Sequence, residues 1–92
     1  MVSLEQKTWK EINIEIAANV KMLRKRKKIS QTMLATKSGV SLGSIKRFEQ
    51  TGEISLQSLT KIAIALEVED EMEKLFKEVP FGSIQEIING QN

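Results

Sequence analysis

Apolar residues recur at helical spacing along most of the chain, in blocks separated by short polar turns. The first block follows a capping-box sequence, in which Thr8 supplies the cap hydroxyl and Glu11 stands three residues later. This pattern predicts a helix that starts after Thr8, runs to about residue 27 and has a charged opposite face. Its expected apolar face consists of Ile12, Ile16, Val20 and Leu23, with Ala17 beside them.

Two shorter helices follow, each predicted from a serine before its first residue and a glycine after its last. Ser30 is the expected N-cap of a helix over 31–38, because its hydroxyl can accept a hydrogen bond from an otherwise unpaired backbone N–H. Gly39 ends that helix, since glycine takes the left-handed conformation at little cost. A third helix over about 42–50 is bracketed in the same way and ends at Gly52. Available for the core are Met33, Leu34 and Ala35 from the second helix, and Ile45 and Phe48, which share a face with Glu49, from the third.

The second half of the chain predicts two more helices of the bundle. Ser55 is the expected N-cap of the fourth, which runs to about residue 66. Asp70 repeats the cap pattern for the fifth, with Glu73 three residues later. The side chains expected to point inward are Leu56, Leu59, Ile62, Ala63 and Leu66 from the fourth helix, and Met72, Leu75 and Phe76 from the fifth.

An apolar segment ends the chain after Pro80. Ser83 and Glu86 form another capping-box sequence, and Gly90 closes the short helix that it opens. The apolar residues of this segment need a burial partner; they are Phe81, Ile84, Ile87 and Ile88. Because no segment reads convincingly as a strand, the predicted fold is all-α: a compact five-helix bundle followed by a short C-terminal helix or tail.

The composition excludes several kinds of site. The chain has no cysteine and no histidine, which rules out a zinc finger, a haem or iron–sulfur centre and a Ser-His or Cys-His nucleophile. It has no Gly-rich phosphate loop and no cluster of metal ligands, so we expect neither an enzyme nor a metal or other cofactor. No apolar run is long enough to span a bilayer, and residues 1–10 are too polar for a signal peptide. A cytoplasmic protein without a membrane partner is the expectation.

The charge is distributed unevenly between the two halves of the chain. Residues 1–52 carry eleven Lys and Arg against four Glu, a net of +7, and residues 53–92 carry three Lys against eight Asp and Glu, a net of −5. This asymmetry favours a polyanion-binding face and a separate second surface, although an unevenly charged solvated surface would give the same counts. In the densest basic stretch, over 21–28, we expect Lys27 and Lys28 to contact phosphate. The other cations there complement the helix dipole.

Residues 30–52 have the arrangement of a helix-turn-helix, with two helices of about eight residues joined by a tight turn at 39–41. Such a pair lets the second helix place its outer face in a major groove while the first helix crosses the backbone. The N-terminus of the first helix is a natural anion site, because its free N–H groups and the helix dipole both favour negative charge.

The residues of this region and its flanks resemble the lambda repressor-like, or Xre, family of phage-repressor-type helix-turn-helix domains. The resemblance extends over about 16–76 and depends on a set of positions in register: Gln31, Ala35, Gly39-Val40-Ser41, Ile45, Phe48-Glu49, Gly52, Ser55, Leu59, Ile62, Ala65 and Leu66. It implies five helices, with 42–50 as the recognition helix. It also implies an interior ion pair between Arg24 and Glu49, and an inward-facing carboxylate does need a partner.

The expected DNA contacts divide into base readout and phosphate binding. Gly43 departs from the family, which commonly has a polar side chain there, and Leu42 can contact only a thymine methyl. Arg47 is the leading base contact, because its guanidinium can bridge the two acceptors of guanine. The full base-reading set is Leu42, Gly43, Ser44, Lys46 and Arg47. The expected phosphate contacts are Gln31, Gln50 and Thr51, which the resemblance implies, together with Ser41, Lys27 and Lys28.

These expectations describe a sequence-specific DNA-binding transcriptional regulator, a repressor that binds a palindromic operator in double-stranded DNA as a homodimer. The dimer contact is expected where the segment that carries Phe81, Ile84, Ile87 and Ile88 meets the same segment of a second copy. Folding back on its own domain and docking to a different protein are the alternatives. The alternative function is an antitoxin, or another protein-interaction module that neutralises a partner protein such as a toxin and autoregulates its operon.

The expected organisation has three parts. Residues 1–11 form an N-terminal extension and the start of the first helix, 12–78 the helix-turn-helix DNA-binding domain, and 79–92 a C-terminal tail for dimerisation or docking. Trp9 is expected to pack as a lid on the bundle, with stacking on nucleic acid as the alternative.

Overall fold

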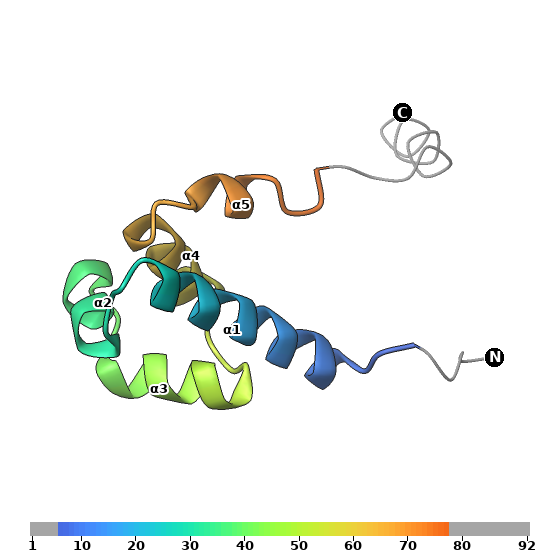
Figure 1. Cartoon of the computed structure of the whole chain (residues 1–92). Helices are drawn as coiled ribbons and strands as arrows, with labels where there is room; N and C mark the ends of the chain where they lie inside the picture. The colour runs from blue at the N-terminus through green and yellow to red at the C-terminus, as the bar shows by residue number, and fades with distance from the viewer. Residues whose placement is uncertain (1–5, 78–92) are drawn as a thin grey trace.

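The computed structural model describes residues 6–77, and this part of the chain contains helices and turns without strands (Figure 1). The predicted all-α bundle is therefore confirmed. Its C-terminal segment and the residues Phe81, Ile84, Ile87 and Ile88 lie outside the described residues. The helices are α1 (Trp9–Arg26), α2 (Gln31–Ser38), α3 (Leu42–Thr51), α4 (Leu56–Ala65) and α5 (Glu69–Glu73).

Hydroxyl caps start the first four helices, as the sequence predicts. Each cap oxygen accepts a hydrogen bond from the backbone N–H three residues later, at 3.0–3.1 Å, which satisfies one of the unpaired donors of the first turn. The caps are Thr8 for α1, Ser30 for α2, Ser41 for α3 and Ser55 for α4.

The fifth helix begins differently from the prediction. Asp70 is not its N-cap, because α5 already starts at Glu69 and its capping residue, Val68, makes no side-chain hydrogen bond. The reason is the turn before it: Glu67 is left-handed (φ 61°), and the Val68 N–H bonds back to the Ala63 carbonyl at 2.9 Å. This Schellman-type closure of α4 leads the chain directly into α5.

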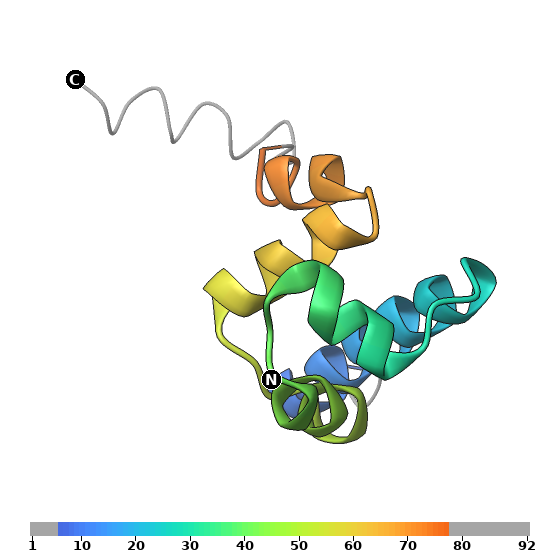
Figure 2. The same cartoon turned by 90° about the vertical axis from the view of Figure 1, so that its left-hand side faces the viewer.

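The long helix α1 crosses the bundle and packs against α3, while α2 packs on both α3 and α4 (Figures 1 and 2). The short helix α5 packs only on α4 among the helix pairs with substantial contact. The core lies where α1 to α4 meet. Its most deeply buried side chains are Leu34, Ile45, Phe48, Ile62 and Leu66, with Ala17, Ile29, Val40 and Ala63 around them.

The inward face of α1 matches the prediction only in part. Ile12 and Ile16 are 45% and 41% exposed, whereas Ala17 and Arg24 are buried. Val20 and Leu23 pack against the core as expected, so the prediction holds for the C-terminal half of the helix. Helix α1 meets α3 through Asn13 at Gly52 and through Arg24 at Glu49, and an apolar periodicity cannot reveal contacts of these polar residues.

Several other apolar side chains expected inside are exposed. Leu56 belongs to an outer row of α4 with Thr60 and Ile64, and Leu75 and Phe76 lie beyond the end of the short helix α5 at Glu73. Trp9 stands on the first turn of α1 and does not act as a lid. The exposed set is Trp9, Met33, Leu56, Leu75 and Phe76, at 46–91% exposure.

Candidate nucleic-acid interface

The outer face of α3 carries most of the residues predicted to read bases. Ile45 and Phe48 anchor the inner face of the helix at 0% and 2% exposure. On the other side the helix is exposed to solvent, and Leu42 alone of the predicted set is half-buried, which limits its contact with a base. The predicted base-reading residues that the structure exposes together are Gly43, Ser44, Lys46 and Arg47.

The turn between α2 and α3 fixes how α3 projects. Gly39 is left-handed (φ 75°), and its N–H closes α2 on the Ala35 carbonyl at 2.9 Å. Val40 is buried in the core, and its N–H donates to the hydroxyl of Ser38 at 3.1 Å. Ser41 then caps α3. One buried side chain between two fixed backbone positions therefore sets the angle between the two helices.

The other end of α3 is fixed by close contact with α1. Gly52 is left-handed (φ 80°), and a Cβ at this position would stand 2.8 Å from the Asn13 carbonyl carbon and 2.9 Å from its oxygen. Only glycine allows this approach of the two backbones. The sequence predicts the helix end at Gly52 but not its contact with Asn13, because the pairing of distant segments leaves no local pattern.

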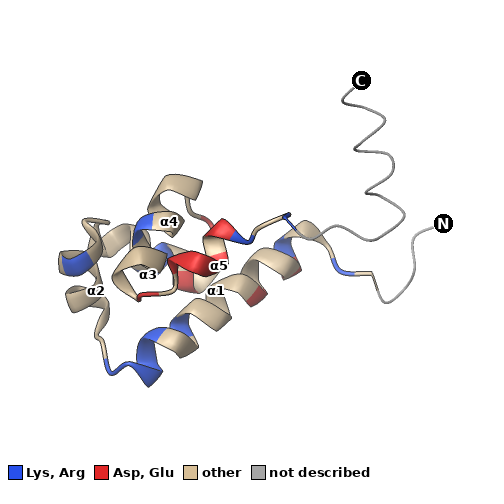
Figure 3. Cartoon of the chain, turned by 90° about the horizontal axis from the view of Figure 1, so that it is seen from above, with Lys and Arg blue, Asp and Glu red and all other residues tan. Residues whose placement is uncertain are grey.

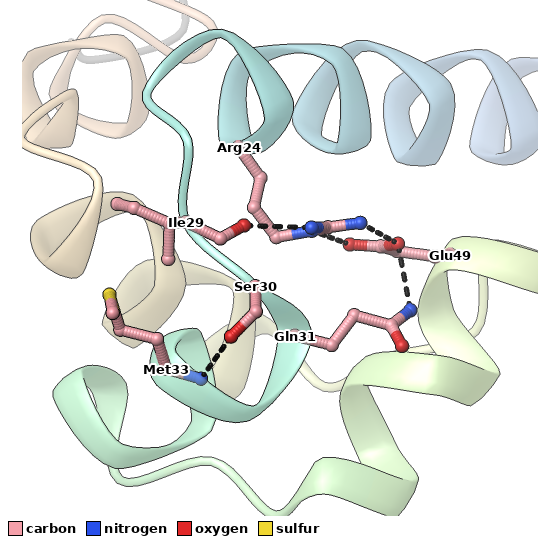
Figure 4. A network of polar contacts seen from close by, with 6 residues as sticks. All are labelled: Arg24, Ile29, Ser30, Gln31, Met33 and Glu49. Carbon is pink, nitrogen blue, oxygen red and sulfur yellow. Dashed lines mark hydrogen bonds and ion pairs between the residues drawn. The ribbon is translucent and has the colours of Figure 1, made fainter.

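A buried polar network joins α1, α2 and α3 behind the recognition face (Figure 4). Arg24 binds the carboxylate of Glu49 with both Nε and Nη2, at 2.7 and 3.0 Å, and donates from Nη1 to the Ile29 carbonyl at 2.8 Å. Gln31 donates from its side-chain amide to Glu49 Oε1 at 3.0 Å. The ion pair that the resemblance implies is thus present. Both charged side chains are less than 10% exposed. Together with Gln31, this buried pair holds the three helices in one arrangement.

The network also changes the acidity of Glu49. Burial on its own raises the pKa of this carboxyl, because a charged group loses solvation. Hydrogen bonds from Arg24 and Gln31, with the charges of Arg24 and Lys21, outweigh that effect and lower the pKa below its ordinary value of 4.5. Glu49 is therefore ionised at neutral pH and pairs fully with Arg24.

Basic side chains gather at the C-terminal end of α1 and on the turn that follows it, beside the N-terminus of α2 (Figure 3). Lys27 and Lys28 are both exposed there. Lys28 is left-handed (φ 57°), and the Ile29 N–H returns to the Arg24 carbonyl at 3.1 Å, which completes a Schellman closure without glycine. The structure brings these two lysines to the same end of the bundle as Ser30 and Gln31 at the start of α2.

The remaining residues predicted to bind phosphate differ in whether their hydrogen-bond donors are already used within the protein. Gln50 is exposed on α3, whereas Gln31 already gives an amide hydrogen to Glu49. The Ser41 hydroxyl donates to Ser44 Oγ at 2.8 Å, and the Thr51 hydroxyl donates to the Arg47 carbonyl at 2.7 Å. Both hydroxyl protons are used inside the protein, so a phosphate contact there would have to displace these bonds.

Arg47 has a partner that the sequence reasoning missed. Its Nη2 lies 2.9 Å from Glu53 Oε2, and both side chains are more than half exposed. The signal was an acidic residue placed just beyond the glycine that ends α3. Spacing alone does not show that the helix end turns this carboxylate back toward Arg47.

Comparison with known proteins identifies one family. A family model described as helix-turn-helix matches residues 20–71, which include the whole of α2, α3 and α4 with parts of α1 and α5. No curated protein and no solved structure matches the chain. In residues 6–77 no three Asp or Glu side chains are grouped so as to hold a metal ion, and no helix is long and apolar enough to cross a membrane.

Proposed function

The chain belongs to the lambda repressor-like (Xre-type) family of helix-turn-helix DNA-binding regulators, and on this premise we propose that it is a sequence-specific repressor that binds a palindromic operator as a homodimer in the cytoplasm. The observation that carries the proposal is the exposed outer face of α3, which presents Ser44, Lys46 and Arg47 and is held from behind by the buried Arg24–Glu49 pair. A helix fixed in this way can enter a major groove without reorganising the bundle.

Base readout depends chiefly on Arg47. An exposed guanidinium on the outer face of a recognition helix can donate to both O6 and N7 of guanine, and such a contact contributes about 1–3 kcal/mol of discrimination. Ser44 and Lys46 add contacts on the same face, while Gly43 permits close approach without reading a base. Lys27, Lys28, Gln31 and Gln50 position the protein on the phosphates, which favours binding to any sequence.

Two single variants separate these roles. Arg47→Ala should lower affinity for the operator roughly tenfold or more and relax the preference at one base pair, with little change on unrelated DNA. Lys28→Ala should weaken binding to both kinds of duplex by similar factors and reduce the slope of log K against log salt by about 1. Equilibrium binding by fluorescence anisotropy at several salt concentrations measures both effects. An Arg47→Ala protein with its full sequence preference intact would refute the role assigned to Arg47.

We place the dimer contact between the C-terminal segment of one copy and an apolar groove of the other. The groove, of about 290 Å³, lies between α1, α4 and α5 and is lined by Ile16, Leu23, Leu59, Leu66, Met72 and Leu75 among others. Apolar surface of this kind marks sites of protein contact. The segment that follows α5 offers Phe81, Ile84, Ile87 and Ile88 as the complementary apolar surface, and a two-fold dimer matches two-fold-related half-sites.

Sedimentation of the full chain at micromolar concentration tests the dimer. A species of twice the 10.4 kDa chain mass is expected. Ile84→Asp should convert it to monomer, whereas Gln85→Asp, next to it in the sequence but outside the apolar set, should not. A wild-type protein that is monomeric both free and on DNA would refute the dimer.

A second candidate function is that of an antitoxin. The acidic helix α5 (red in Figure 3) carries Glu69, Asp70, Glu71 and Glu73, and the exposed Leu75 and Phe76 follow it. This helix lies across the bundle from α3 (Figure 1), and its surface suits a basic protein partner. A neighbouring gene whose product arrests growth, and is neutralised by co-expression with this chain, would favour it. Phe76→Asp should then abolish neutralisation and leave DNA binding intact.

A further inference from the structure

The ion pair between Arg47 and Glu53 has no evident structural purpose. Its nitrogen and oxygen are 2.9 Å apart, but the two side chains are 67% and 56% exposed. Pairs this exposed contribute little to folding, because water screens the charges and two long side chains must be ordered. The pair nevertheless involves the side chain on the recognition face that is best suited to bind guanine.

The position of Glu53 is determined by the end of α3. The Thr51 hydroxyl donates to the Arg47 carbonyl at 2.7 Å and accepts the Glu53 N–H at 3.2 Å. Between them, Gly52 is held against the backbone of Asn13 on α1. The backbone of Glu53 is therefore linked through Thr51 to the backbone of Arg47, and the Glu53 carboxylate pairs with the Arg47 guanidinium. These contacts close a ring over Arg47, Thr51 and Glu53.

We propose that Glu53 is a specificity-determining residue of the DNA-binding face, which positions Arg47 for base readout and disfavours its pairing with phosphate. The inference rests on the proposed DNA-binding function and deepens it. The Glu53 carboxylate lies 2.9 Å from Nη2 of Arg47, and an arginine has five N–H donors, so the guanidinium keeps enough donors for the two acceptors of a guanine.

Two physical effects act in the same direction. An unrestrained arginine loses rotamer entropy when it is fixed, and the ring already restricts the Arg47 side chain before DNA binds. The Glu53 carboxylate also repels phosphates that approach the end of α3, within a screening distance of about 8 Å at physiological salt. Both effects favour binding of Arg47 to base acceptors over its binding to phosphate.

A double-mutant cycle tests the inference. Affinities of the full-length wild type, Glu53→Gln, Arg47→Ala and the double variant are measured for the duplex that the wild type selects and for a scrambled duplex of equal length. Glu53→Gln should reduce the ratio of the two affinities roughly five- to tenfold, partly because the scrambled duplex binds more tightly. In the Arg47→Ala background the same substitution should leave the ratio unchanged.

Two further variants separate positioning from simple charge. Glu15→Gln removes a similarly exposed carboxylate on the N-terminal half of α1, which pairs with Lys7 and not with Arg47, and the ratio should not change. Glu53→Asp keeps the charge but shortens the side chain by one methylene, so it should lower affinity for the selected duplex and leave the scrambled one unaffected. Circular dichroism confirms that each variant is folded.

The outcomes distinguish failure of the role assigned to Glu53 from failure of the proposed DNA-binding function. If Glu53→Gln raises the affinity for both duplexes by the same factor, or acts equally with and without Arg47, Glu53 is only a distant charge and the inference is wrong. If the wild type itself shows no preference between the duplexes, the proposed function fails, and the inference fails with it.

Discussion

At the scale of single residues, two glycines that both end helices differ in what surrounds them. Gly39 and Gly52 are both left-handed, but a Cβ at Gly39 meets nothing within 4 Å, whereas a Cβ at Gly52 meets the Asn13 backbone at 2.8 Å. Gly39→Ala should therefore cost only the left-handed strain, about 1–2 kcal/mol. Gly52→Ala should cost roughly 1–3 kcal/mol more, since the backbones of α1 and α3 must separate. Urea unfolding followed by circular dichroism measures both, and equal losses would mean that α1 and α3 are not in this contact.

A third left-handed position offers a gain in stability. Glu67 is exposed and left-handed (φ 61°) in the closure of α4, where glycine is the favoured residue. Glu67→Gly should raise the free energy of unfolding by about 1 kcal/mol, because the strain of a side chain in this conformation is removed. Glu67→Ala, which keeps a Cβ, is the matched control and should show no such gain. A stabilisation by alanine equal to that by glycine would assign the effect to lost charge instead.

At the scale of the elements, the Arg24–Glu49 pair makes the packing of α1 and α3 sensitive to acid. The pKa of Glu49 is lowered in the folded protein, so its ionised form adds stability above its ordinary pKa of 4.5. That stability is lost as the pH falls through the folded value. Glu49→Gln should cost about 3–5 kcal/mol at pH 7, because it leaves the charge of Arg24 buried without its partner.

The difference between wild type and Glu49→Gln should shrink as the pH falls below 4.5. Unfolding free energies from urea titrations at a series of pH values give the curve, with Glu15→Gln as a control for an exposed pair. A difference that stayed constant down to pH 3 would show that Glu49 is not held in its ionised form by Arg24 and Gln31.

At the scale of the whole molecule, the parts of the fold that depend on local chemistry could be predicted from the sequence. The hydroxyl caps at Thr8, Ser30, Ser41 and Ser55 act within one helical turn, and Gly39 and Gly52 end helices through their own backbone. The predicted N-cap at Asp70 is wrong, because the cap pattern is local whereas the start of α5 is set by the turn after α4.

The parts that depend on contacts between distant segments were not accessible in this way. Ile12 and Ile16 follow the helical period but are 45% and 41% exposed, because α1 meets α3 through the charged pair of Arg24 and Glu49. The role of Arg24 follows from the resemblance to a family, whereas the pairing of Glu53 with Arg47 depends on how the chain turns after α3 and leaves no local pattern in the sequence.

The central claim is that α3 reads a DNA sequence, and selection from a random duplex pool tests it most directly. Purified full-length protein is equilibrated with the pool at near-physiological salt, and bound duplexes are recovered and sequenced over several rounds. The account predicts an enriched palindrome whose half-sites are about 10 base pairs apart from centre to centre, with a guanine in each half-site that Arg47→Ala no longer selects. Weak, salt-sensitive binding without any enriched sequence would contradict it.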